Sequence, residues 1–592
     1  MAEEAGIPKA RAVEDALTAV EKAVETGRAL VAENPEAFLP DLATALNNQS
    51  AMLSRLGRRD EALTAVEEAV EIRRGLAAIR PEAFRPDLAS ALNNQSLMLG
   101  DLGRREDALA VTEEAVQIYR GLAATRPRVF VPDLATALNN QSLMLRGFGR
   151  REDALAAIDE AVEIRRGLAE AHPDAFLPNL AISLSNQSSC LSGLGRREEA
   201  LRAIEQAVEI RRELVAGHSE AFLPNLATAL NSQSNRLSEL GRREDALTAI
   251  DEAVEIRREL ASARPDAFLP DLAATLGNQS GCLSELGRRD DALAAIEEAV
   301  EIRRGLASAR PDAFLPDLAT ALSNLSGSLS GVGRRDDALA AIEEAVEIRR
   351  GLAATRGAFL PDLAVSLNNL AGNLSDLGRR DDALVAIEEA VEIRRALAAI
   401  RGAFLPDLAT ALSNQSLMFG GLERHEDGLA AIEEAVEIHR GLAETHPDLF
   451  MPALAGALSS RANTLSELWR AEDALTVTEE AVAIYRGLAA AHPDAFVPAL
   501  ASALNSRSNR LSELGRREDS LAAIEEALNL VLPLLEQGRN VPPDAGMHLV
   551  QAYLTRFQDA EGDPDPELIE RIRAVLVAAG LVTEEEDDDG WA

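Results

Sequence analysis

The sequence predicts an all-α fold, an α-solenoid built from tandem antiparallel helical hairpins, and three observations lead to that class. The phrase Leu-Asn-Asn-Gln-Ser near the N-terminus returns, lightly edited, about every 46 residues. Hydrophobic residues make up 47% of the chain but aromatic residues only 3%, a composition typical of closely stacked helices. Apolar residues within each copy recur at helical spacing. A fixed period of this length indicates a solenoid, in which each unit packs only on its neighbours.

The leading leucine of the phrase marks eleven copies. Eight of the ten steps between these leucines are 46 residues long, and the other two are one residue shorter. The copies together span residues 38–538. Their leading leucines are Leu46, Leu92, Leu138, Leu184, Leu230, Leu276, Leu322, Leu367, Leu412, Leu458 and Leu504.

Each copy contains start and stop signals for two helices. In the first copy Pro40 occupies a position that proline tolerates in a first helical turn, and Gly57 ends that helix as a left-handed cap. A second helix begins near Asp60 and stops before Pro81, because the residue before proline avoids helical geometry. These signals predict helices of about 17 and 21 residues.

The two ends of the chain depart from the repeat. Residues 1–37 match only a second helix, which predicts an N-terminal half-repeat that forms a cap helix. Beyond the last copy, residues 539–583 predict a C-terminal helical cap with helices near 544–559 and 565–580, because terminal repeats expose an apolar face. Residues 584–592 begin with an unbroken acidic run and are expected to be disordered.

The net charge of −38 argues against two classes of partner. A surface this acidic repels phosphate backbones and anionic lipid, so neither nucleic acid nor a membrane surface is an expected partner. The acidity is explained either by the solubility of a long alanine-rich array or by a basic protein partner.

The two cysteines and the lack of a long apolar run bear on the compartment. Cys190 and Cys282 occupy the same position two copies apart, too far for a disulfide, so we expect free thiols in a reducing compartment. No apolar run approaches the ~20 residues of a membrane span, and the first residues lack a signal-peptide core. We expect a cytoplasmic protein.

The repeat resembles the tetratricopeptide repeat. When Gly57 is aligned with the interhelix glycine of that family, Leu46 falls at its large first-helix position and Ser50 at its small one. The unit is about twelve residues longer than the usual 34, and Gln49 replaces a leucine that is usually buried. The long form looks most like the repeats of kinesin light chains and of many bacterial (actinobacterial) regulatory proteins. The resemblance implies a right-handed superhelix whose first helices line a concave groove.

The motifs of common enzymes are missing, so we expect no catalytic activity, no cofactor and no metal site. Neither Lys9 nor Lys22 belongs to a phosphate-binding loop, and no His-Glu-x-x-His motif occurs. The seven histidines are scattered, which does not suit a metal cluster. The repeated Glu-Glu-Ala-Val-Glu-Ile-Arg-Arg stretches predict a solvated helix face with local ion pairs such as Glu71 with Arg74.

A row of asparagines on the first helices is the candidate binding site. The resemblance implies that such residues hold the backbone of an extended peptide, since an amide both donates and accepts hydrogen bonds. The alternative is that they bond to neighbouring helices and stiffen the array. The row consists of Asn48, Asn94, Asn140, Asn186, Asn278, Asn324, Asn369 and Asn414, with Ser232, Ser460 and Ser506 at the same position in the remaining copies.

Two further positions lead to predictions. The glutamine that follows the asparagine, Gln49 in the first copy, lies in the apolar stripe, so we predict that it pairs along the stack rather than leaving a buried amide unbonded. Trp469 replaces the helix-ending glycine, as does Glu423. An exposed tryptophan is a possible interaction hot spot, and sequence drift is the alternative explanation.

Taken together, these features predict a non-enzymatic scaffold for protein–protein interaction that holds a protein or extended peptide in its groove. The near identity of the units also allows a homo-oligomer, a self-associating structural assembly. A third hypothesis is the sensing arm of a signalling regulator whose catalytic domain lies on another chain, which rests on analogy.

Overall fold

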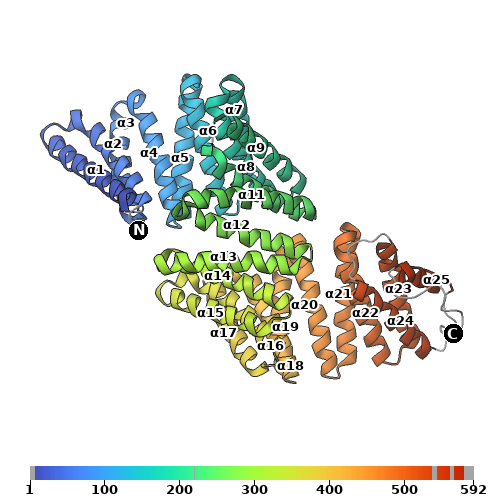
Figure 1. Cartoon of the computed structure of the whole chain (residues 1–592). Coiled ribbons are helices and arrows are strands. Elements are labelled where there is room, and N and C mark those ends of the chain that lie inside the picture. The colour runs from blue at the N-terminus through green and yellow to red at the C-terminus, as the bar shows by residue number, and fades with distance from the viewer. Residues whose placement is uncertain (1–6, 219, 537–542, 561–565, 579–592) are drawn as a thin grey trace. The chain divides into compact units, whose positions relative to one another are not determined.

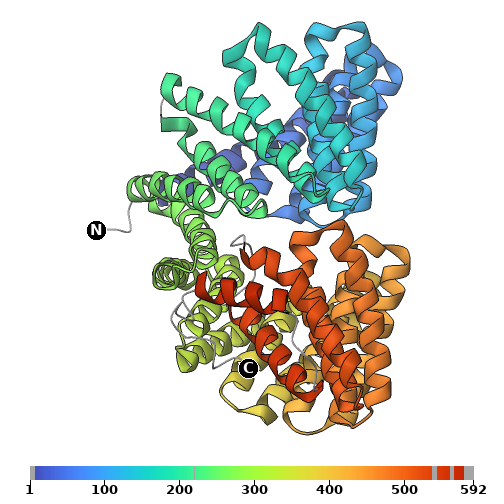
Figure 2. The ribbon, with the colours of Figure 1, turned by 90° about the vertical axis from the view of Figure 1, so that its right-hand side faces the viewer.

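The computed structural model describes residues 7–218, 220–536, 543–560 and 566–578. Within these ranges the chain consists of helices and short turns, and no strand occurs. The chain divides into two compact units, Met1–Ala309 and Arg310–Ala592, which we describe separately. In each unit the helices follow one another side by side in chain order (Figures 1 and 2). The prediction of an all-α array of tandem hairpins is confirmed, and its right-handed superhelical twist stays a prediction.

The first unit contains one N-terminal helix followed by six helical hairpins. Its elements are α1 (Ile7–Glu33), α2 (Pro35–Arg55), α3 (Arg59–Ile79), α4 (Pro81–Asp101), α5 (Arg105–Thr125), α6 (Pro127–Gly147), α7 (Arg151–Ala171), α8 (Pro173–Gly193), α9 (Arg197–His218), the 3-10 turn η1 (Glu220–Phe222), α10 (Leu223–Glu239), α11 (Arg243–Ala263), α12 (Pro265–Glu285) and α13 (Arg289–Ala309).

The second unit continues the same alternation. Its elements are α14 (Pro311–Gly331), α15 (Arg335–Thr355), η2 (Gly357–Phe359), α16 (Leu360–Asp376), α17 (Arg380–Ile400), η3 (Gly402–Phe404), α18 (Leu405–Gly421), α19 (His425–Thr445), α20 (Pro447–Glu467), α21 (Ala471–Ala491), α22 (Pro493–Glu513), α23 (Arg517–Glu536), α24 (Pro543–Ala560) and α25 (Pro566–Ala578). We call the even-numbered helices α2 to α22 first helices and the odd-numbered helices α3 to α23 second helices.

A three-residue turn joins the two helices of each hairpin. In the first hairpin the N–H of Arg58 donates to the carbonyl of Leu53 and the N–H of Gly57 donates to that of Ser54, both at 3.0 Å. This is the Schellman pattern, which needs a left-handed residue, and Gly57 has φ +75°. The predicted left-handed glycine cap is confirmed.

The first helices begin earlier than the sequence suggested. The structure starts them at Pro35 and its equivalents, so most have 21 residues, and Pro40 lies inside the helix instead of in its first turn. Asn34 before the proline is extended, with φ −147° and ψ 86°, which separates the helix from α1. Pro40 is tolerated because its ring removes only one backbone hydrogen bond, close to the helix N-terminus.

Three joints between hairpins lack the proline, and there the helix does begin later. Each of these joints contains one 3-10 turn (η1, η2 or η3). The helices that follow, α10, α16 and α18, have 17 residues each. Without a proline at the first helical position, nothing fixes φ for an α-helical start in these joints. The predicted length of about 17 residues is therefore correct for these three helices and wrong for the longer ones.

The core of each unit is built from the repeated small and branched apolar side chains. All eleven leading leucines are 0–1% exposed. Second-helix alanines such as Ala69 are fully buried, which lets neighbouring helices approach closely. Cys190 and Cys282 are buried free thiols, as predicted.

Helices α24 and α25 follow the last hairpin. Helix α24 packs against α23 through Tyr553, whose side chain is fully buried, and α25 also contacts α23. The acidic residues 584–592, expected to be disordered, lie outside the described residues.

Candidate functional site

The first helices present a polar exposed stripe. In α2 the exposed positions are Asp41, Thr44, Asn48 and Ala51, which recur every three or four residues and so share one side of the helix. The same positions are exposed in α14, where the last is Gly327. We call this stripe the first-helix face; the predicted asparagine row lies along it.

Five asparagines of the row donate a hydrogen bond to the preceding hairpin. In each case the amide nitrogen meets the amide oxygen of a second asparagine, which lies one position before the row. The pairs are Asn94 to Asn47 at 3.1 Å, Asn140 to Asn93 at 3.0 Å, Asn186 to Asn139 at 3.0 Å, Asn278 to Asn231 at 2.8 Å and Asn414 to Asn368 at 2.8 Å. These bonds connect adjacent first helices, as the stiffening alternative expects, and each donor keeps one N–H and its carbonyl oxygen.

Three members of the row have no such partner. The side chains of Asn48, Asn324 and Asn369 are exposed and make no hydrogen bond to any residue that the structure describes. Asn369 follows a copy that has Ser323 where the acceptor asparagine would be. The structure therefore divides the row into bonded and unbonded amides, and only the unbonded ones offer all their hydrogen-bonding groups.

The seven glutamines next to the row are half-buried, and two of them pair with the preceding second helix. The amide nitrogen of Gln187 donates to Asp159 at 2.7 Å, and that of Gln279 donates to Asp251 at 2.6 Å. Pairing along the stack is thus confirmed for these two residues. In α20 the same position is Arg461, whose guanidinium contacts Glu433 at 2.9 Å.

A column of buried arginines on the second helices was not predicted. The interpretation of the Glu-Ile-Arg-Arg stretch as a wholly solvated face is wrong for its first arginine. The members are 5–8% exposed: Arg73, Arg165, Arg211, Arg257, Arg349 and Arg394. A sequence signal existed, since Arg73 lies four residues after Ala69 on the buried stripe and is replaced elsewhere by Tyr119, His439 and Tyr485.

Each well-bonded member of this column connects three helices. The guanidinium of Arg257 in α11 donates to the carbonyl of Asp271 at 2.6 Å and to the hydroxyl of Thr275 at 2.5 Å, both in α12. It also donates to the hydroxyl of Thr228 in α10 at 3.2 Å. Such bonds offset the cost of burying a charge.

Arg211 lacks these partners. The equivalent hydroxyl positions are Ile182 and Ala229, and Nη1 of Arg211 is buried without a hydrogen bond. Burial lowers the pKa of Arg211 to about 10. His439 takes the arginine position in α19; its Nδ1 is also buried without a partner, and burial lowers its pKa.

The outer side of the second helices carries ion pairs between hairpins. Arg74 bonds with Glu114 of the next second helix at 2.6 Å, so the local pair of Arg74 with Glu71 predicted from the sequence does not form. The same long-range pair recurs in both units, for example between Arg212 and Glu252 and between Arg395 and Glu434. These side chains are about half exposed, so each pair contributes roughly 0–1 kcal/mol.

Trp469 is the least buried large apolar side chain of the described chain, at 94% exposure. It occupies the turn between α20 and α21 with φ +60°. Glu423, in the turn before, also has φ +60°. Nine other turns have glycine at this position, with φ between +72° and +81°.

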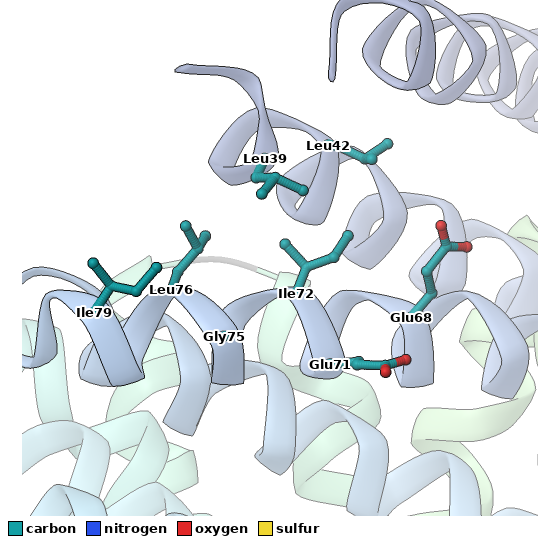
Figure 3. A pocket seen from close by; sticks show the side chains of 8 residues that line it. All are labelled: Leu39, Leu42, Glu68, Glu71, Ile72, Gly75, Leu76 and Ile79. Carbon is teal, nitrogen blue, oxygen red and sulfur yellow. The ribbon is translucent and has the colours of Figure 1, made fainter. Parts of the chain in front are cut away.

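The hollow between α2 and α3, of about 450 Å³, is wide open and lined mainly by aliphatic side chains such as Leu39, Ile72 and Ile79 (Figure 3). Of its carboxylates, Glu68 pairs with Arg28 at 2.6 Å. Among the described residues, no His, Cys, Asp and Glu side chains group in a way that could hold a metal ion. Within the same ranges, none of the helices is long and apolar enough to cross a bilayer.

Family models match much of the repeat array. One tetratricopeptide repeat model matches residues 317–396, and a second matches residues 42–76, 88–122, 134–174, 180–220 and 226–266. A model of anaphase-promoting complex subunit 5 matches residues 274–310 and 405–447. No curated protein matches the chain.

Two solved structures of repeat proteins are similar to part of this chain. BtubC (BKLC) from P. vanneervenii is 19% identical over 42% of this chain and 92% of that chain, with a TM-score of 0.35. A putative kinesin light chain from Podosopora anserina with nearly identical TPR-like repeats is 17% identical over 38% of this chain and 98% of that chain, with a TM-score of 0.30.

Repeat models match in both units, and the helical hairpins recur at the spacing of about 46 residues that the sequence shows. The chain therefore contains tetratricopeptide repeats in both units, at the residues that these models match.

Proposed function

We propose that the chain is a non-enzymatic scaffold that binds an extended segment of a partner protein along the first-helix face. Tetratricopeptide repeats generally mediate protein–protein interaction. The observation that supports this surface is the set of exposed, unbonded amides of Asn48, Asn324 and Asn369, in a row whose other five members each bond to an asparagine of the preceding hairpin. An extended peptide offers N–H and C=O groups at regular intervals, and a free asparagine amide can bond to both.

The bonded asparagines support the same proposal in another way. Each Asn–Asn bond fixes the orientation of an amide. Asn140 is buried, but the other four donors are partly or fully exposed, so their remaining N–H and oxygen can meet a ligand. A side chain that is already ordered loses little conformational entropy on binding. The two roles considered for the row are thus compatible, since bonding between hairpins and binding of a peptide use different atoms.

Photocrosslinking tests which surface meets the partner. Several glycines within helices have no neighbouring atom within 4 Å of an added Cβ, and four of them suit this test: Gly281 and Gly327 on first helices, and Gly305 and Gly351 on second helices. A photoreactive residue placed at each of these sites is irradiated in a lysate of the source organism. We expect a partner protein to crosslink from Gly281 and Gly327 but not from the matched sites Gly305 and Gly351.

Substitution of the free amides then tests the role of the row. The double variant Asn324→Ala and Asn369→Ala breaks no bond within the described chain, so the fold is expected to be unaffected. With about 1 kcal/mol for each lost amide contact, partner affinity falls about 30-fold. Equal crosslinking from all four glycines, or unchanged affinity in the double variant, contradicts the proposal.

A further inference from the structure

The conformation of Trp469 destabilises its turn, and no contact within the fold offsets this cost. A bulky residue at positive φ places its Cβ close to the following carbonyl oxygen, which is unfavourable. The indole buries almost none of its surface, so packing does not offset that cost. Glycine, which nine equivalent turns have, would avoid both penalties. A strained and exposed residue of this kind favours a role outside the fold.

Trp469 also lacks the cation that covers other aromatic rings of this chain. An arginine guanidinium lies 4.6–5.8 Å from the ring centre of five phenylalanines: Phe84, Phe130, Phe268, Phe314 and Phe419. The last of these belongs to the turn before Trp469, where Arg424 covers Phe419. No arginine or lysine of the described chain lies over the indole, although tryptophan is the aromatic side chain that binds cations best.

The charges around the turn suit a cationic ligand. Arg470 is paired with Asp473 at 2.8 Å, and the contact of His425 with Glu467 at 2.9 Å brings the preceding turn alongside. In that turn Arg424 is paired with Asp427 at 2.7 Å. Arg470 and Arg424 are therefore neutralised.

Exposed carboxylates occur in and directly after the two turns. Glu472 lies three residues after Trp469 in α21, Glu423 lies in the α18–α19 turn, and Glu426 lies in the first turn of α19. All three side chains are exposed. Together with the ring, they form a negative surface at the α20–α21 turn.

We propose that the α20–α21 turn is a docking point for a basic segment of a partner protein, in which an arginine or lysine side chain stacks on the indole of Trp469. The carboxylates of Glu423 and Glu472 face the same cation and favour its approach. A second copy of the chain does not fit, because two chains with a net charge of −38 repel each other. This surface lies on a turn and is independent of the first-helix face.

Two matched glycine substitutions separate docking from folding. Trp469→Gly and Glu423→Gly each restore the residue that other turns have, so both variants relieve backbone strain, but only the first removes the ring. The probe is a fluorescein-labelled nine-residue peptide of alternating arginine and serine. Its binding to the full chain is followed by fluorescence anisotropy at 0.15 M salt, where nonspecific attraction is screened within about 8 Å.

We expect Trp469→Gly to weaken binding of the arginine–serine peptide about tenfold, the effect of losing one cation–π contact. Glu423→Gly, which removes one peripheral charge, should weaken it less than about threefold. A Trp591→Phe background leaves Trp469 as the sole tryptophan, so its emission should change when the peptide saturates the site.

Three results would overturn the proposal. These are equal affinities of the two glycine variants, equally tight binding of a peptide of alternating glutamate and serine, or an indole emission that the arginine–serine peptide leaves unchanged. Failure here leaves the first-helix face untouched, because the photocrosslinking glycines lie on other surfaces.

Discussion

Replacement of Arg211 by methionine should stabilise the first unit. Methionine keeps an unbranched apolar stem of similar length and removes the charge of a residue that is only 7% exposed. Burial lowers the pKa of Arg211 well below its ordinary value, to about 10, and one pKa unit corresponds to about 1.4 kcal/mol, so burial of the charge costs at most about 3.5 kcal/mol. Relaxation and water penetration reduce such penalties, and we expect a gain of about 1–2 kcal/mol.

Arg257 provides the matched control. It occupies the same position one copy later, but it makes three hydrogen bonds to Asp271, Thr275 and Thr228. Bonds from a charged donor contribute about 1.5 kcal/mol each, which exceeds the cost of burial. Arg257→Met is therefore expected to destabilise its surroundings by about 1–2 kcal/mol.

Hydrogen–deuterium exchange with peptide-level mass spectrometry is the suitable assay, because a repeat array unfolds locally and has no single free energy of unfolding. Amides of α8, α9 and α10 should exchange more slowly in Arg211→Met, by roughly 5- to 30-fold. Amides of α10, α11 and α12 should exchange faster in Arg257→Met. If both variants change protection in the same direction, hydrogen-bond partners do not decide the contribution of this column, and the reasoning is refuted.

Three further predictions concern other positions. Trp469→Gly should raise the unfolding temperature of its region in calorimetry, since it removes a bulky residue from a left-handed conformation and gains about 1 kcal/mol. Gly515→Ala should lower the unfolding temperature of its own region, since it costs a similar free energy; a shift of both temperatures in the same direction would contradict the strain argument. In a double-mutant cycle, Asn93→Ala and Asn140→Ala should show a coupling of about 1 kcal/mol, and additive effects would mean that their 3.0 Å bond contributes nothing. Burial lowers the pKa of His439, so the unfolded chain binds a proton more readily and stability is lost as pH falls from about 7 through that lowered pKa. Protection factors in α19, which compare exchange with the intrinsic rate at each pH, should therefore fall between pH 7.5 and 5.0 in the natural chain but less in His439→Leu, and an identical pH response would disprove the assignment.

The repeat, the turns and the helix stops could be predicted because each depends on one or two residues. Gly57 is needed for a left-handed turn whatever surrounds it, and the extended residue before Pro81 follows from the proline ring. The start of the first helix could not be fixed in this way. Pro35 and Pro40 are both compatible with an early helical position, and only packing shows that the helix already begins at the first of them.

The candidate site was predictable only where one position decides the outcome. The asparagine row is visible in the sequence, yet whether a member is bonded depends on a second residue in the preceding copy, as the pair Asn140 and Asn93 shows. The buried arginines were hidden by their neighbours: Arg73 and Arg74 are adjacent and chemically equal, but Arg73 is buried and Arg74 is exposed, because consecutive residues lie about 100° apart around a helix. Helical spacing from Ala69 separates them, while composition does not.

The joints that lack proline have a consequence for how such an array tolerates insertions and deletions. In the shortened copies the contact from Arg349 to the carbonyl of Asp362 spans 13 residues, whereas the equivalent contact from Arg257 to Asp271 spans 14. The ion pair of Arg350 with Glu389 is likewise one residue closer in sequence than that of Arg258 with Glu298. In these copies the 3-10 turn absorbs the loss of one residue, and the contacts on both sides of the joint are kept. A change in chain length at a joint therefore does not alter the faces that would meet a ligand.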